Sequence, residues 1–108
     1  MSLIRQGDVL VIPVATIPRN TKPVKRDQGR VVLAYGEATG HAHTISHPDV
    51  RLVSAEQAGE LRMWMQVTAP EPVELEHDEH DTLLIPPGTY EVRRQREYSP
   101  EEIRTVAD

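Results

Sequence analysis

The chain has 108 residues, the size of one domain, and we predict a single domain over residues 1–108. It contains no cysteine, which excludes disulfides, thiolate zinc sites and cysteine nucleophiles. The net charge is −5, although residues 1–30 carry six Lys or Arg against two Asp. This acidic balance argues against a dedicated nucleic-acid binder.

The N-terminal residues do not resemble a targeting segment. Arg5, Gln6 and Asp8 interrupt the first apolar residues, so no signal peptide is expected. No apolar run approaches the roughly 20 residues that a membrane-spanning helix needs. We therefore expect a cytoplasmic protein without a membrane partner.

The first third of the chain predicts two buried strands separated by a basic loop. Residues 8–12 form an apolar run that ends at Pro13, and residues 31–35 form a second one. The basic loop, at about 19–30, is polar and contains proline and glycine. A solvated loop is its simplest interpretation, and phosphate binding is the alternative.

A third strand carries the motif His-x-His. On a strand, side chains at i and i+2 share a face, so His41, His43 and Ile45 lie together. Ile45 indicates that this face is directed inward. Residues 50–53 predict another short strand, and residues 61–67 alternate with Trp64 on the face away from the core.

Residues 73–77 repeat the pattern of the third strand. Val73 and Leu75 are expected to face the core, so His77 should face it as well. Residues 78–79 predict a bend that brings the chain back at His80. Four of the five histidines thus form two pairs, His41 with His43 and His77 with His80. Because His77 repeats the inward position of His41 and His43, we expect one shared site.

The C-terminal part predicts two more strands and a helix. Residues 82–85 form an apolar strand, and residues 90–98 form a polar one whose arginines either line a cavity or protect a sheet edge. Ser99, Pro100 and Glu102 fit a helix N-terminal capping box. The whole pattern predicts an all-β fold: a small antiparallel barrel or sandwich of about seven to eight strands with a short C-terminal helix.

The histidines suggest a metal site. Imidazole binds Zn, Fe, Ni, Co, Mn or Cu, so we predict a divalent transition metal held by His41, His43, His77 and His80. The acidic residues around them should raise the histidine pKa values, so that protons compete with the metal. The alternative is two unrelated pairs, one in the core and one on a solvated loop.

Other polar residues are candidates for supporting roles. Glu37 and Glu76 are candidate general bases, and Arg94 and Arg96 are candidate contacts for a small anionic substrate. His47 precedes a proline in a turn and is at best an accessory ligand. His77 and His80 are not spaced as in the H-E-x-x-H motif, which excludes a metalloprotease of that kind.

Two stretches resemble the motifs of the cupin superfamily. Gly36 followed by 41–43 is similar to the first cupin motif, and residues 81–88 are similar to the D-x-x-x-x-P-x-G part of the second. The resemblance covers about residues 36–90 and implies a small metal-binding β-barrel. The first gap is one residue short, no Glu follows the His-x-His, and Tyr90 and Glu91 replace the usual third histidine. The third ligand would here come from His77 or His80.

Two classes of function stay open on the sequence. The first is a metal-dependent enzyme, hydrolase or oxygenase-like, with an open coordination position. The second is a non-catalytic binding or accessory module in which a metal is structural, sensed or absent. A homodimer through an exposed strand edge suits a small β-domain of either class.

Overall fold

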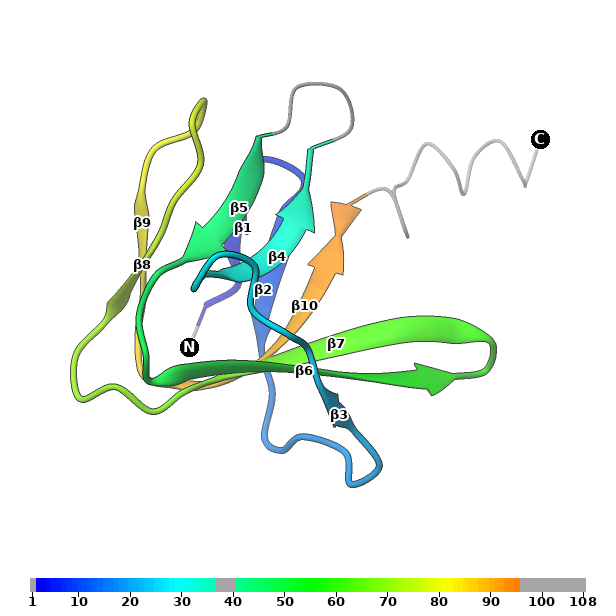
Figure 1. Ribbon diagram of the computed structural model, residues 1–108. Helices are drawn as coiled ribbons and strands as arrows, with labels where there is room; N and C mark the ends of the chain where they lie inside the picture. Colours follow the sequence, from blue (N-terminus) through cyan, green and yellow to red (C-terminus); the bar gives the residue numbers. More distant parts are fainter. Residues whose placement is uncertain (1, 37–40, 96–108) are drawn as a thin grey trace.

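The computed structural model describes residues 2–36 and 41–95 (Figure 1). The predicted helix after Ser99 therefore lies outside the described residues. The strands in chain order are β1 (Ile4–Gln6), β2 (Val9–Pro13), β3 (Lys22–Pro23), β4 (Val31–Tyr35), β5 (Ala42–Ile45), β6 (Val50–Gln57), β7 (Glu60–Val67), β8 (Val73–Leu75), β9 (Leu83–Ile85) and β10 (Gly88–Arg94).

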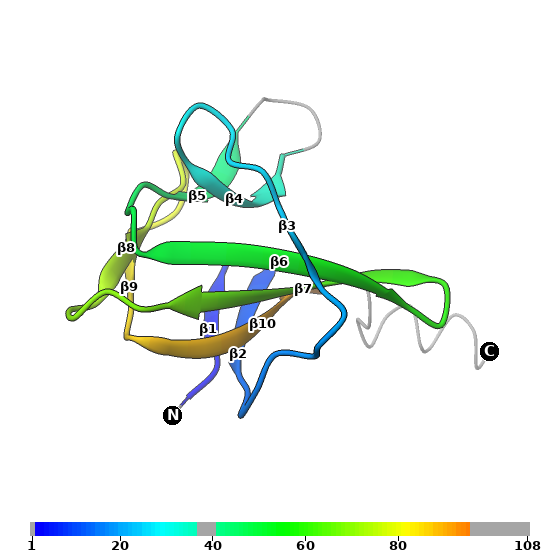
Figure 2. The same ribbon diagram turned by 60° about the horizontal axis from the view of Figure 1, so that its bottom comes forward.

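The strands form two layers, and the predicted all-β antiparallel class is confirmed. One layer is a six-stranded sheet in the order β1-β2-β10-β7-β6-β3. The other consists of the pairs β4-β5 and β8-β9 (Figure 2). An isolated bridge between Thr44 and Glu76 joins these two pairs. Within the described residues the large sheet is open and ends at β1 and β3, so the sandwich alternative holds and the barrel alternative is wrong.

The core lies between the layers because alternate residues of each strand point inward. The large sheet contributes mainly valine, with Met65 and Tyr90 fully buried, while the second layer contributes Leu33, Ile45 and Leu75. The buried apolar residues of this core form one cluster that draws on most of the strands: Val9, Val11, Val31, Leu33, Ala34, Ile45, Val50, Leu52, Met65, Val67, Ala69, Val73, Leu75, Ile85, Tyr90 and Val92.

β10 is a central strand, so the edge-strand interpretation of residues 90–98 is wrong for its described part. It pairs with β2 on one side and β7 on the other. Its charged residues are accommodated there by ion pairs, between Arg94 and Asp8 and between Arg93 and Glu91. Arg94 alternates with Val92 and Tyr90 and so lies on the inner face of the sheet.

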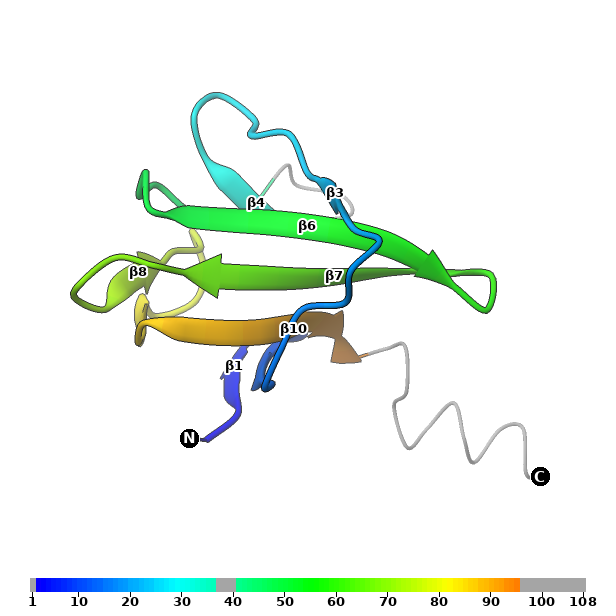
Figure 3. The ribbon, with the colours of Figure 1, turned by 90° about the horizontal axis from the view of Figure 1, so that it is seen from below.

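The β6–β7 hairpin extends beyond the second layer (Figures 1 and 2). Leu61, predicted to face the core, is therefore 66% exposed near its tip. Trp64 faces away from the core as predicted, yet it is only 4% exposed. The segment between β2 and β3 crosses this outer face (Figure 3), and the guanidinium of Arg62 lies 5.6 Å from the Trp64 ring centroid.

Candidate functional site

Four histidine rings from two distant segments lie together at one end of the sandwich. The ring centroids of His43 and His77 are 4.3 Å apart, and those of His77 and His80 are 4.6 Å apart. The His41 centroid is 5.7 Å from that of His77, and the His43 and His80 centroids are 6.0 Å apart. The structure thus brings the two predicted pairs together.

The bridge between β5 and the end of β8 explains this convergence. The amide of Glu76 donates to the Thr44 carbonyl over 2.8 Å, and the Thr44 amide donates to the Glu76 carbonyl over 3.0 Å. In an antiparallel pair with this register, His43 lies opposite His77 and His41 lies opposite Glu79. The backbone hydrogen bonds between Thr44 and Glu76 therefore set the imidazoles of His43 and His77 side by side.

Gln6 fixes the orientation of the most buried ring. Its side chain amide nitrogen donates to the carbonyls of Leu75 and Asp81, over 2.8 Å and 3.0 Å. Its oxygen therefore faces Nδ1 of His43, at 2.8 Å, and accepts a hydrogen bond from it. In the neutral ring the proton is then on Nδ1, and the lone pair is on Nε2.

The neutral form of His43 is favoured. Burial of the ring, together with the neighbouring His77, His80 and Arg94, lowers its pKa to about 4, and the opposing effect of Asp8 is smaller. The expectation that the acidic surroundings raise the histidine pKa values is therefore wrong for His43. The reason is that the ring is only 4% exposed, so desolvation outweighs the nearby carboxylate.

Asp8 and Arg94 form an ion pair beside His43. Arg94 donates from Nε and Nη2 to Oδ2 of Asp8, over 3.2 Å and 2.8 Å. The other carboxylate oxygen, Oδ1, lies 3.6 Å from Nε2 of His43. Burial opposes ionisation of Asp8, but Arg94 outweighs it and holds the pKa below its usual value. Arg94 is thus placed to orient a carboxylate, whereas the sequence predicted a substrate contact.

The other three rings occupy more open positions. The amide of Glu79 donates to Nδ1 of His77 over 3.0 Å. His41, 27% exposed at its side chain, has Nδ1 3.2 Å from Glu79 and Nε2 3.5 Å from Asp78. His80 packs its ring tip on the turn between β1 and β2, where a Cβ added to Gly7 would lie 2.6 Å from Nε2.

In this arrangement, no group of three or more His, Cys, Asp or Glu side chains is already placed to hold a metal ion, as far as the described ranges 2–36 and 41–95 extend. Ring rotation is therefore a condition of metal binding. His77 would have to turn, because its Nδ1 lone pair accepts the Glu79 amide.

The remaining predicted residues lie elsewhere or outside the described ranges. Glu76 lines a hollow of about 310 Å³ together with Arg30, Thr44 and His77. By strand alternation, the side chains of Thr44 and Glu76 lie on the face opposite His43. His47 accepts the Asp49 amide at its own Nδ1, over 3.0 Å. Glu37 and Arg96 fall in the segments that the structure does not describe.

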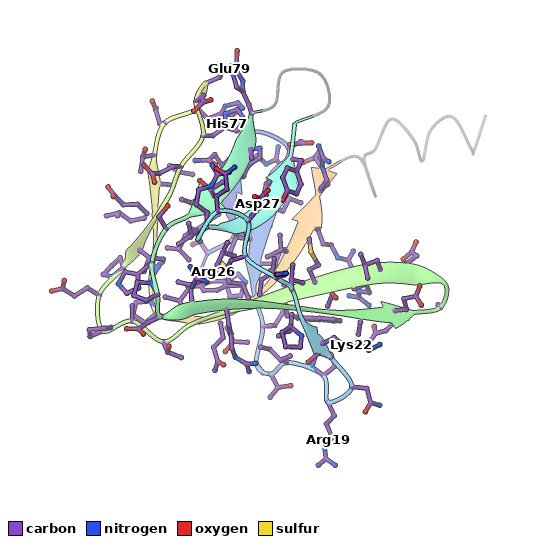
Figure 4. All side chains as sticks on the ribbon, in the orientation of Figure 1. Arg19, Lys22, Arg26, Asp27, His77 and Glu79 are labelled. Carbon is purple, nitrogen blue, oxygen red and sulfur yellow. The ribbon has the colours of Figure 1, made fainter. Side chains whose placement is uncertain are left out.

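The first part of the basic segment lies far from the histidine rings. Figure 4 shows Arg19 and Lys22 far from His77 and Glu79. Arg26 donates to the carbonyls of His47, Pro48 and Val50, so it fastens this segment to the turn before β6. Arg19 and Lys22 are thus separated from the histidine rings, whereas Arg30, at the end of the segment, lines the same hollow as His77.

Sequence reasoning missed Gln6 and Asp8. One signal was present for Gln6: it lies two residues after Ile4, so an inward apolar position is followed by an inward amide. A buried amide needs partners, which marks such a residue as structural or functional. Asp8 gave no comparable signal, because the side chains that it contacts, His43 and Arg94, are far from it in the sequence.

A family model described as "Domain of unknown function (DUF8820)" matches residues 5–95. The chain belongs to this family. The match runs from the second residue of β1 to the end of β10 and includes all five histidines, together with Gln6 and Asp8. No curated protein and no solved structure matches the chain. No helix in the described part of the chain has the length and apolarity needed to cross a bilayer.

Proposed function

We propose that this protein binds one divalent transition-metal ion between β5, the β8–β9 connection and the β1–β2 turn. The observation that carries the proposal is the grouping of His43, His77 and His80. A Zn–N bond of about 2.0–2.1 Å puts each ring centroid about 3.2 Å from the ion, and hence two centroids about 4.5–6 Å apart. The centroid distances of 4.3–6.0 Å among the three rings are close to this range.

The state of His43 supports the same proposal. Metal-bound histidines usually donate the second ring N–H to a carbonyl or carboxylate, which fixes the tautomer. The bond from His43 Nδ1 to Gln6 is of this type, and it leaves Nε2 for the ion. His41 remains a predicted ligand, from the exposed rim.

A catalytic role finds less support than binding. Glu76 pairs with Thr44 and alternates with His77, so its side chain points to the face opposite His43, although His77 also lines the hollow beside it. An enzyme with an open position, a cupin relationship, a small anionic substrate, a homodimer and a cytoplasmic location stay predictions from the sequence. A closed shell of four protein ligands would support the non-catalytic alternative with a structural or sensed metal.

Elemental analysis tests the proposal. Protein purified without chelators should contain close to one equivalent of a transition metal per chain. His43→Ala and His77→Ala should each lose it, whereas His47→Ala should retain it, because His47 lies outside the group of rings. A metal-free wild-type protein that also takes up no zinc or cobalt on addition would reject the proposal.

A further inference from the structure

Two hydrogen-bond acceptors face each other at the centre of the site. Nε2 of His43 carries a lone pair, because Gln6 takes the proton-bearing nitrogen. Oδ1 of Asp8 lies 3.6 Å away, on a carboxylate whose other oxygen accepts two hydrogen bonds from Arg94. A neutral imidazole with this tautomer has no proton to offer at Nε2, so the pair has no hydrogen bond between its members.

The distance fits two ligands of one cation. Two donor atoms each about 2.1 Å from a tetrahedrally coordinated ion are about 3.4 Å apart. The 3.6 Å between Nε2 and Oδ1 is close to that separation. A cation between the two atoms would convert a contact of two acceptors into two bonds.

We infer that Asp8 is the oxygen ligand of the proposed metal ion, with Oδ1 opposite Nε2 of His43. This inference rests on the proposed function and names a ligand that the sequence did not suggest. Arg94 holds Oδ2 of the same carboxylate and is a positioning residue. Gln6 is a second positioning residue, since its amide nitrogen is fixed by two backbone carbonyls.

The ligand set selects a class of metal. Three imidazoles with one carboxylate suit borderline divalent ions such as Zn, Co, Fe, Mn or Ni. Copper(I) prefers soft sulfur ligands, and calcium prefers an all-oxygen shell. We therefore expect zinc and cobalt to bind, and calcium to bind at least about 100-fold more weakly.

Cobalt titration of the intact chain tests the role of Asp8. Asp8→Asn should lower cobalt affinity about 100-fold or more, because the ligand loses its charge while an oxygen remains for Arg94. Asp78→Asn is the matched control: it removes one negative charge 3.5 Å from His41, and should change affinity less than about threefold. Asp8→Glu keeps the carboxylate and should recover part of the affinity.

The outcomes separate this inference from the proposed function. If wild-type protein binds one cobalt ion and Asp8→Asn binds it equally well, Asp8 is not a ligand although the metal site stands. Equal losses in Asp8→Asn and Asp78→Asn would also overturn the inference, since general charge would then explain them. If wild-type protein binds no cobalt, the proposed function itself fails.

Nitrogen NMR of the metal-free protein tests the positioning role of Gln6. The His43 ring should show one tautomer, protonated at Nδ1, and Gln6→Leu should give a mixture of the two tautomers. Folding of the variant is checked by its backbone amide spectrum, and Gln66→Leu serves as a control distant from His43. A His43 ring protonated at Nε2 in wild-type protein would overturn the arrangement of acceptors.

Discussion

At the scale of single residues, the site depends on the close approach of the His80 ring to the backbone of Gly7. Gly7 has a positive φ of 58°, and an added Cβ would lie 2.6 Å from Nε2 of His80. Gly29 has a similar φ of 79° but no atom within 4 Å of such a Cβ. The two glycines therefore share a left-handed backbone conformation, but only Gly7 lies against a histidine ring of the site.

This pair of glycines gives a matched test of His80. Gly7→Ala and Gly29→Ala should each lose about 1–2 kcal/mol of stability, the usual cost of a left-handed L-residue. Only Gly7→Ala should also weaken zinc binding, because the methyl group displaces the His80 ring. Urea unfolding and zinc titration measure the two effects. Unchanged zinc affinity in Gly7→Ala would remove His80 from the ligand set.

Glu91 makes stability depend on pH. Its burial opposes ionisation, but hydrogen bonds and charges from Arg62 and Arg93 outweigh this and lower its pKa below 4.5. The stabilisation is therefore fully present above pH 4.5 and is lost as the pH falls through the lowered value. Between about pH 5 and pH 3, Glu91→Gln should lose less unfolding free energy than wild type. An identical loss in both proteins would contradict this role.

At the scale of elements, two tight turns are built from residues with positive φ. Ala58 and Gly59, between β6 and β7, have φ of 53° and 81°, the signs that a type I′ turn requires. Gln28 and Gly29 repeat the pattern between Asp27 and Arg30. The second residue is glycine in both turns, whereas the first carries a side chain that disfavours this conformation.

Ala58 is accordingly a position where stability can be raised. Asparagine tolerates positive φ and precedes glycine in favoured type I′ turns. Ala58→Asn should therefore stabilise the protein by about 0.5–1 kcal/mol in urea unfolding. Ala55→Asn, within β6, is the control and should destabilise it. A loss of stability in Ala58→Asn would contradict the turn assignment.

The elements also show what the sequence could predict. The alternation of side chains identified β5, β7 and β8. It also placed the His43 and His77 rings on the same face, where their centroids lie 4.3 Å apart. It could not show that β10 is central, because ion pairs to Asp8 and Glu91 offset the charges that suggested an edge. Likewise, Trp64 faces away from the core and is still only 4% exposed, and local periodicity carries no information on the contacts that cover it.

At the scale of the whole molecule, the proposed ion would join three separate pieces of the sandwich. His43 belongs to β5, His77 and His80 to the β8–β9 connection, and Asp8 to the β1–β2 turn of the other layer. These pieces have no such geometry in the unfolded chain. An ion that binds only the folded protein shifts the unfolding equilibrium toward the native state.

The thermal consequence can be measured. Zinc at 100 times its dissociation constant should add about 2.7 kcal/mol of stability. For a domain of this size, that is a rise in Tm of roughly 10–20 °C. His77→Ala, at a partly exposed position, should fold and lose most of the rise, and magnesium should give none. An equal rise in wild type and His77→Ala would place the zinc elsewhere.

The most direct measurement is an anomalous-scattering map from crystals soaked in zinc. We predict one strong peak per chain, within about 2.0–2.2 Å of nitrogen atoms from His43, His77 and His80 and of Oδ1 of Asp8. No peak in that position, or a peak at His47 while these rings keep their metal-free contacts, would contradict the account.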